Sequence, residues 1–280
     1  METITDEKIK ELKIQANEIR KSIINMLCEA KSGHTAGSLG MADIFTYLYK
    51  VALKHKPENP NWNDRDRLVL SNGHICPVLY ATMAHSGYFP IEELNTLRKF
   101  GSRLQGHPYR EFLPMIETSS GPLGEGLSQA IGMAIASRID NGINKKIYCL
   151  VGDGELNEGQ NWEAIMLASK EKLNNLILIV DRNYIQIDGS TETVMPLGDL
   201  LSKFKSFDWN GETIDGNDFK EINNAIYNAE NEHEKPYVII AKTVPSKGVT
   251  KWEGNYKWHG IAPNKEERDM AIQELNDINF

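Results

Sequence analysis

Residues 176–183 have the sequence Leu-Ile-Leu-Ile-Val-Asp-Arg-Asn. Five apolar residues with no polar position among them predict a strand that is buried on both faces, as in a parallel sheet. The chain becomes polar at Asp181, so polar groups lie at the carboxyl end of this strand. Three further apolar runs are also followed by polar residues, at 68–70, 147–151 and 237–241. The sequence therefore predicts four buried, parallel strands with their chemistry at the carboxyl ends.

Stretches with helical spacing alternate with these runs. Apolar residues recur at steps of three and four from Ile9 to Leu27, which predicts an amphipathic helix that ends before Ser32. Residues 127–139 and 162–173 are also predicted to be helical. The alternation predicts an α/β fold, an open and mostly parallel sheet with helices on both faces. We find no repeat and no long linker, so we expect residues 1–280 to form a single domain. For residues 264–275, a terminal helix and a frayed tail are both open.

The composition excludes several classes of protein. Of the 280 residues, 40% are hydrophobic and 25% are charged, and the formal net charge is -8. Disorder and a membrane span are therefore not expected, and the bulk charge does not favour a nucleic acid. The cysteines, Cys28, Cys76 and Cys149, are odd in number and far apart, which indicates packing residues in a reducing compartment. The first thirteen residues do not have the pattern of a signal peptide, and we expect a cytoplasmic protein.

An aspartate and an asparagine follow two of the predicted strands. Asp153 stands between two glycines, and Asn183 follows the next strand along the chain. Mg²⁺ takes about six oxygen ligands, of which a protein often supplies one or two while phosphates and water supply the rest. The glycines allow the backbone to approach a diphosphate, and the carbonyl of Ile185 could complete the protein's share. Gly-Asp-Gly alone is more often a turn, but its combination with Asn183 predicts a diphosphate clamp.

Motifs along nearly the whole chain resemble those of transketolases, which are thiamine diphosphate enzymes, and they occur in the same order. They are KSGHTAGSLG at 31–40, DRDR at 64–67, SNGH at 71–74, GHP at 106–108, SGPLGEG at 120–126, GDGELNEG at 152–159, DRNYIQIDG at 181–189 and WHG at 258–260. The chain is similar to the N-terminal, diphosphate-binding half of a transketolase, in the form in which the enzyme is divided between two polypeptides.

The resemblance implies a role for each matching residue. It places the metal ion on Asp153, Asn183 and the carbonyl of Ile185. The metal ion is Mg²⁺, for which Ca²⁺ or Mn²⁺ can substitute. The resemblance places the cofactor, thiamine diphosphate, against His74, Gly121, Leu123, Gly154, Asn183 and His259, with Glu158 beside it at the contact with the partner half of the enzyme. It assigns His34, His107 and His259 to the sugar, where they would bind hydroxyl groups and assist proton transfers as catalytic residues.

Imidazole suits such proton transfers because its ordinary pKa is near 6.5. A single histidine in a loop is nevertheless more often a surface or packing residue, and we assign His55, His85 and His233 to that group. The histidines of the site differ from them because each is adjacent to a glycine within a matching motif: His34, His74, His107 and His259.

Some positions depart from the family's pattern or have no assigned role. Residues 109–112 differ from the usual sequence, and Glu125 stands where glutamine is common, so the donor and acceptor sugars are open. The spacing of glycines over 121–126 is not a nucleotide-binding fingerprint. Residues 64–67 are expected to form a solvated or salt-bridged turn. Trp252 and Trp258 have two equally open interpretations. They either pack the last loop over the site or cover a partner surface, or they belong to the core.

One part of the family's active site is absent from the motifs. The glutamate and the aromatic pocket that act on the cofactor's aminopyrimidine belong to the family's second domain, and the 20 residues after Gly260 are too few to form it. The resemblance therefore implies the N-terminal subunit of a heteromeric transketolase, which transfers a two-carbon ketol unit from a ketose phosphate to an aldose phosphate. We expect an α2β2 heterotetramer with a C-terminal, pyrimidine-binding subunit, without nucleic acid or membrane.

Two alternatives stay open at this stage. The first is a transketolase-like subunit for a modified, sulfonated or non-phosphorylated sugar. The second is a non-catalytic module that keeps the fold and has lost the chemistry.

Overall fold

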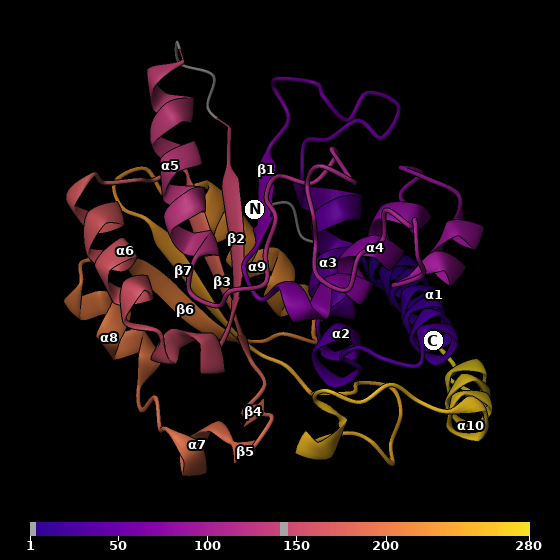
Figure 1. Ribbon diagram of the computed structural model, residues 1–280. Helices are drawn as coiled ribbons and strands as arrows, with labels where there is room; N and C mark the ends of the chain where they lie inside the picture. Colours follow the sequence, from indigo (N-terminus) through magenta and orange to yellow (C-terminus); the bar gives the residue numbers. More distant parts are fainter. Residues whose placement is uncertain (1–3, 141–144) are drawn as a thin grey trace.

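A five-stranded parallel sheet forms the centre of the computed structural model, which describes residues 4–140 and 145–280 (Figure 1). The strand order is β1-β2-β3-β7-β6. The strands are β1 (Arg67–Leu70), β2 (Ile147–Gly152), β3 (Leu176–Arg182), β6 (Asn210–Asp215) and β7 (Tyr237–Lys242). A short antiparallel pair, β4 (Ile185–Gln186) and β5 (Gly189–Ser190), follows β3 directly. The carboxyl ends of β2 and β3 and this pair gather in the lower part of Figure 1.

Helices cover both faces of the sheet. On one side lie α1 (Asp6–Ala30), α2 (Ala36–Gly40), α3 (Ala42–Tyr47), α4 (Cys76–His85), α9 (Phe219–Glu230) and α10 (Lys265–Asn276). On the other side lie α5 (Gly126–Ile139), α6 (Gly159–Lys170) and α8 (Leu200–Ser206). The shorter elements in the part of the chain that the structure describes are α7 (Thr191–Val194), a π-helical turn (Leu48–Ala52) and four 3-10 turns (Gly73–Ile75, Ile91–Thr96, Gly154–Asn157 and Tyr256–Trp258). The predicted α/β architecture is therefore confirmed.

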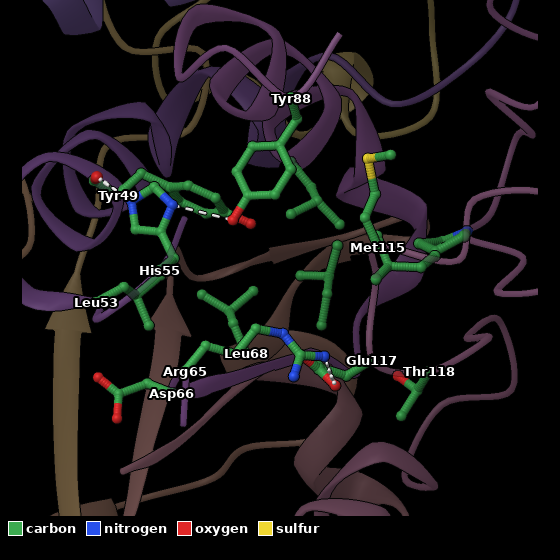
Figure 2. A pocket seen from close by; sticks show the side chains of 14 residues that line it. Tyr49, Leu53, His55, Arg65, Asp66, Leu68, Tyr88, Met115, Glu117 and Thr118 are labelled. Atoms are coloured by element: carbon green, nitrogen blue, oxygen red, sulfur yellow. Dashed lines mark hydrogen bonds and ion pairs between the residues drawn. The ribbon is translucent and has the colours of Figure 1, made fainter. Parts of the chain in front are cut away.

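Residues 115–118, in the loop that follows His107, lie against the amino-terminal end of β1 (Figure 2). Arg65 and Arg67 form ion pairs with the Glu117 carboxylate at 2.8 Å and 3.6 Å. Burial raises the pKa of Glu117, and the two arginines oppose that shift. A small cavity of about 30 Å³ lies beside this cluster, where His55 bonds to the hydroxyl of Tyr88. Of the two forms expected for the turn at residues 64–67, solvated or salt-bridged, the structure shows the salt-bridged one. Its arginines hold the loop that contains Glu117.

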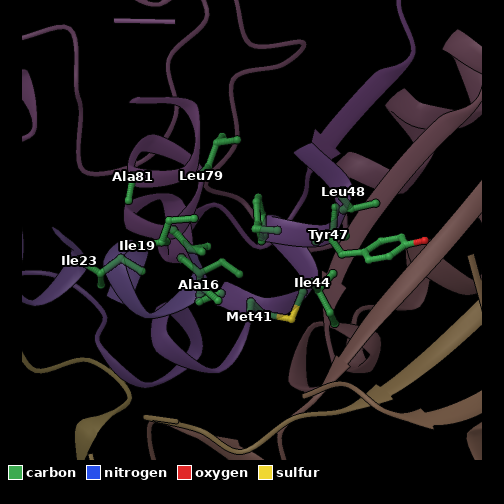
Figure 3. Packing of buried hydrophobic residues seen from close by; sticks show 14 of the residues in the cluster. Ala16, Ile19, Ile23, Met41, Ile44, Tyr47, Leu48, Leu79 and Ala81 are labelled. Atoms are coloured by element: carbon green, nitrogen blue, oxygen red, sulfur yellow. The ribbon is translucent and has the colours of Figure 1, made fainter. Parts of the chain in front are cut away.

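The alternation of side chains along the strands explains why both faces are apolar. In β3, Ile177 and Ile179 belong to the core that packs against α1, α3, α4 and α9. Leu176, Leu178 and Val180 belong to the core under α5, α6 and α8. Figure 3 shows the first core, in which side chains of α1, α3 and α4 interdigitate. A strand with both faces covered needs an uninterrupted apolar sequence.

The predicted elements are found with small shifts, and one strand of the five-stranded sheet was missed, together with the short β4–β5 pair. The four predicted strands are β1, β2, β3 and β7, the N-terminal helix is α1, and residues 127–139 lie in α5. The helix predicted at 162–173 begins and ends three residues earlier, since the left-handed backbone of Lys172 (φ 48°) lies just past its end. The missed strand is β6, the sheet's edge, where Ile214 is the one buried residue.

Two open points of the sequence are resolved. Residues 265–276 form helix α10, which begins with a capping box between Asn264 and Glu267. Trp252 is buried and stacks on Trp258, with their ring centroids 4.0 Å apart, so this pair packs the last loop on the core. The three cysteines are free and buried, as expected for packing residues. No helix within residues 4–140 or 145–280 is long and apolar enough to cross a membrane.

Candidate active site

A cavity of about 190 Å³ opens at the carboxyl ends of β1, β2 and β3. It is lined by Asn72, His74, Leu123, Gly152, Asp153, Gly154, Glu155, Asp181, Asn183, Ile185, Gln186, Ile187, Asp188 and His259. Seven of the residues singled out in the sequence are therefore brought together: His74, Leu123, Asp153, Gly154, Asn183, Ile185 and His259. The side of a parallel sheet where its loops diverge is the usual place for a ligand.

The remaining sequence-predicted residues are not among those that line this cavity: His34, His107, Gly121 and Glu158. His34 is adjacent to His74 and His259. Gly121 lies against His107, since a Cβ at Gly121 would be 3.8 Å from its ring. Glu158 is exposed at the start of α6, and its side chain does not line the cavity.

Asp153 is held at the end of β2 by donors from two directions. Its Oδ1 accepts the N–H of Gly154 at 2.8 Å. Its Oδ2 accepts the N–H of Tyr184 at 2.8 Å and Nη1 of Arg182 at 3.0 Å. The side chain is buried, and burial raises the pKa of Asp153, whereas these donors oppose that shift. A carboxylate oxygen has two lone pairs, so Oδ1 retains the capacity to bind a cation.

Asn183 is oriented by Asp181, two residues before it. Asn183 donates through Nδ2 to Oδ2 of Asp181 at 2.8 Å, and its Oδ1 accepts the N–H of Ile185 at 3.0 Å. The Thr243 hydroxyl, after β7, donates to the other oxygen of Asp181. Burial raises the pKa of Asp181 to about 7. Asp181 belongs to one of the matching motifs, but its orienting role was not predicted from the sequence.

The residues present fit a hard cation together with a polar ligand. Asp153, Asn183 and the backbone at Ile185 offer oxygen atoms, and Mg²⁺ commonly takes few protein oxygens with the rest from phosphate and water. Within the described ranges, no group of three or more His, Cys, Asp or Glu side chains could hold a metal without such help. Four polar atoms at or beside the cavity are buried without a hydrogen-bond partner: Asn72 Oδ1, Gln186 Nε2, His34 Nδ1 and His259 Nδ1. Buried polar atoms need partners, and a polar ligand would supply them.

Three of the predicted histidines form one cluster. The ring centroids of His34 and His74 are 4.8 Å apart, those of His74 and His259 are 5.3 Å apart, and those of His34 and His259 are 5.6 Å apart. Burial lowers the pKa of each ring, and that of His34 falls to about 4. Burial also lowers the pKa of His107. These imidazoles are therefore neutral near pH 7.

The other histidines lie outside the cluster. His55 bonds to Tyr49 and Tyr88, and His85 bonds to the hydroxyl of Ser22 at 2.9 Å. His233 is exposed in the turn before β7. Their assignment as packing or surface residues agrees with these contacts.

A buried glutamate that sequence reasoning passed over joins three segments of the site. The Glu155 carboxylate accepts the Ser71 hydroxyl and the N–H of Gly124 through Oε1, and the N–H of Gly152 at 3.0 Å through Oε2. Ser71 in turn accepts the N–H of Gly126 at 3.0 Å. The loop that contains Gly121 and Leu123 is thereby fixed to the ends of β1 and β2. The signal that could have identified Glu155 in the sequence is its position in the GDGELNEG motif, two residues after Asp153.

The neutral histidine cluster predicts a pH-dependent stability. His34, with its pKa near 4 in the folded chain and near 6.5 when unfolded, binds its proton mainly in the unfolded state as the pH falls. Its contribution to stability is complete above pH 6.5 and is lost progressively toward pH 4. Urea unfolding at pH 7.5 and pH 5 should show a smaller loss of unfolding free energy for His34→Gln than for the wild type. Equal losses in the two proteins would contradict this prediction.

The fold and the cavity define a class of protein. It is an α/β protein whose parallel sheet is covered by helices on both faces and whose ligand site lies at the carboxyl ends of the strands. The model of the family described as transketolase, thiamine diphosphate binding domain, matches residues 12–276, and the chain belongs to this family. The resemblance seen in the motifs is therefore confirmed.

The curated relatives include proteins that this chain matches over nearly their whole length. A 6-deoxy-6-sulfo-D-fructose transketolase subunit of a Clostridium species is 40% identical over 265 residues, which cover 95% of this chain and 96% of the relative. An apulose-4-phosphate transketolase subunit of Phocaeicola vulgatus is 37% identical, with 96% of this chain and 95% of the relative covered. The transketolase structure of Campylobacter jejuni matches with a TM-score of 0.88 and 38% identity over 96% of this chain and 43% of that one. The chain thus matches whole subunits and about two fifths of the Campylobacter enzyme.

Proposed function

We propose that this chain is the N-terminal subunit of a heteromeric transketolase that binds thiamine diphosphate through Mg²⁺, with Ca²⁺ or Mn²⁺ as substitutes. The observation that carries the proposal is one cavity in which Asp153 and Asn183 meet His74 and His259, with His34 against both rings. The chain would act as a single cofactor-binding domain of a cytoplasmic enzyme, and its free, buried cysteines are consistent with a reducing compartment.

The polar residues of the cavity divide into a metal-binding and a cofactor-binding group. Asp153, Asn183 and the Ile185 carbonyl would hold the metal. The backbone of Gly154 and the ring of His74 would bind the diphosphate, and Gly121 and Leu123 would line the cofactor. Thiamine diphosphate, when bound, supplies the nucleophilic carbon that receives the two-carbon unit.

The histidines would hold the sugar and its protons. Neutral imidazole has one donor and one acceptor nitrogen, so His34, His107 and His259 can each bind a hydroxyl group. His34 and His259 each have a buried Nδ1 without a partner, which is consistent with a group that arrives with the substrate. A neutral ring can also accept a proton from a sugar hydroxyl and return it.

A C-terminal, pyrimidine-binding subunit would complete the enzyme, in an α2β2 heterotetramer. The relatives that this chain matches over their full length are named as subunits. Large apolar side chains are exposed on the cavity's rim and on α6: Leu123, Ile187, Met166 and Leu167. Glu158 is exposed at the start of α6 and would face the partner there, next to the cofactor. No group in the described residues suggests a nucleic acid partner.

The sugar substrates have two candidates. The first is ketol transfer from a ketose phosphate to an aldose phosphate, as in other transketolases. The second is transfer with a modified sugar, which is favoured by the names of the full-length relatives, a sulfonated ketose and apulose 4-phosphate. Residues 109–112, the departure from the family sequence, begin two positions after His107 and include the exposed side chains of Tyr109 and Phe112.

Reconstitution with the partner subunit tests this proposal. We expect no ketol transfer by the chain alone and measurable transfer by the complex, assayed with xylulose 5-phosphate and ribose 5-phosphate, and in parallel with 6-deoxy-6-sulfo-D-fructose and apulose 4-phosphate. Turnover confined to the modified sugars supports the second candidate. Robust turnover by the isolated chain would overturn the need for a partner. A complex that binds thiamine diphosphate but is inert toward every sugar would indicate a non-catalytic module.

A further inference from the structure

Arg182, the last residue of β3, is a buried cation for which the proposed chemistry has no use so far. Its side chain is 6% exposed, and it contacts the central carboxylate of the cavity directly. Nη1 donates to Oδ2 of Asp153 and to Oγ1 of Thr191, both at 3.0 Å. Nη2 pairs with the Glu192 carboxylate. The guanidinium therefore connects the end of β2 with α7, the helical turn that follows the β4–β5 pair.

The backbone two residues after Arg182 has a left-handed conformation, which neighbouring contacts stabilise. Tyr184 has a left-handed backbone (φ 63°), an uncommon conformation for an aromatic residue. Its N–H donates to Asp153, and its carbonyl accepts the N–H of Thr191 at 3.1 Å. The guanidinium of Arg182 lies 4.1 Å from the centroid of the Tyr184 ring, a cation–π contact. This bend leads directly into Ile185, whose carbonyl is a proposed metal ligand.

The contacts of Arg182 leave one carboxylate oxygen for the cavity. Arg182 and Tyr184 both occupy Oδ2 of Asp153, whereas Oδ1 accepts the N–H of Gly154. The guanidinium is also the cation that pairs with this carboxylate, because Asp153 is buried and forms an ion pair with Arg182 at 3.0 Å. This ion pair fixes Oδ2 of Asp153 on the side away from Gly154, whose N–H donates to Oδ1.

We propose that Arg182 is a positioning residue of the cofactor site: it holds Asp153 with Oδ1 toward the cavity and fixes the bend that presents Ile185. The inference rests on the proposed function, since it concerns the binding of Mg²⁺ and thiamine diphosphate. Arg182 is not among the residues assigned to the metal or to the cofactor. Groups that orient a metal ligand typically change the affinity by about 10–100-fold when they are replaced.

The test is the affinity of the two-subunit complex for thiamine diphosphate with Mg²⁺, measured by isothermal titration calorimetry. We expect Arg182→Gln to raise the Kd about 10–100-fold. Arg182→Lys should fall between this variant and the wild type, because an ammonium group can pair with Asp153 but lacks the planar fork that also reaches Thr191 and Glu192. Glu192→Gln is the matched control: it removes an exposed partner of Arg182, and the Kd should change less than about fivefold.

A stability measurement separates positioning from a merely structural role. The melting temperature of each complex is recorded without ligand and with Mg²⁺ and thiamine diphosphate. A positioning role predicts that the ligand-induced rise is smaller in Arg182→Gln than in the wild type, since ligand stabilisation follows affinity. Equal Kd values and equal rises for the two proteins would overturn the inference and leave the proposed function intact. A wild-type complex without affinity for thiamine diphosphate would overturn the proposed function itself. If Arg182→Gln does not fold, Arg182→Lys carries the same comparison.

Discussion

Replacement of Asp153 by asparagine should weaken the binding of thiamine diphosphate with Mg²⁺ by more than about 100-fold. Outer residues of metal sites already change affinity by about 10–100-fold, and Asp153 is proposed as a direct ligand. The variant keeps the shape of the side chain and removes its charge, in a cavity where the other proposed ligands, Asn183 and the Ile185 carbonyl, are neutral. Asp153→Ala should bind no better, because it removes the oxygen atoms as well.

Isothermal titration of the reconstituted complex measures this effect. Asp188→Asn serves as the matched control, since it makes the same change on an exposed carboxylate that lines the same cavity. The control shows what the loss of one negative charge near the ligand does in general. The Asp153 variants should also be checked for folding in the absence of ligand, because Arg182 loses a buried partner. Wild-type affinity in Asp153→Asn would remove the metal-site assignment.

Replacement of Glu155 by alanine should lower the free energy of unfolding by about 2–5 kcal/mol, since it leaves the buried N–H of Gly124 and the half-buried N–H of Gly152 without an acceptor. Glu155→Gln should lie between, because its amide oxygen can still accept from Ser71 and Gly124 while its NH₂ group meets the N–H of Gly152. Urea unfolding of the ligand-free chain gives these values.

The matched control for Glu155 is three residues away. Glu158→Ala removes an exposed carboxylate from the same segment and should change the unfolding free energy by less than about 0.5 kcal/mol. A comparison of the two variants therefore separates the effect of losing a buried hydrogen-bond acceptor from the effect of losing a surface charge. If the alanine variants at 155 and 158 were equally stable, Glu155 would not be the connection between the three segments.

The sequence predicted the sheet because its central strands are covered on both faces. Residues 176–180 and 147–151 are uninterrupted apolar runs, and the rule that parallel strands present ligands at their carboxyl ends placed Asp153 beside Asn183. β6 escaped prediction for the opposite reason: as an edge strand it buries Ile214 alone, and its other residues are polar or glycine.

The supporting residues of the site could not be found in the same way. Glu155 and Arg182 are charged residues whose partners are distant in sequence, Ser71 and Asp153, and nothing local distinguishes a buried charge with partners from an exposed one. The histidines were recognised from the family's motifs, but their convergence into one cluster depends on the packing of separate loops. The lowered pKa values were also unpredictable, because burial depends on that packing.

The last loop gives the site an unusual folding requirement. The hydroxyl of Thr35, next to His34, donates to the carbonyl of Ile261, which is 226 positions away. Asn17 in α1 likewise bonds to the carbonyl of Leu275 in α10, across 258 positions. Closing a loop of this length costs more chain entropy than a local contact does, so contacts of such long range slow folding. His259 lies in this last loop, so the histidine cluster exists only when the loop has packed beside His34 and His74. The end of the chain is therefore needed to complete the site, and the cofactor meets all of its proposed ligands only after the last loop has packed.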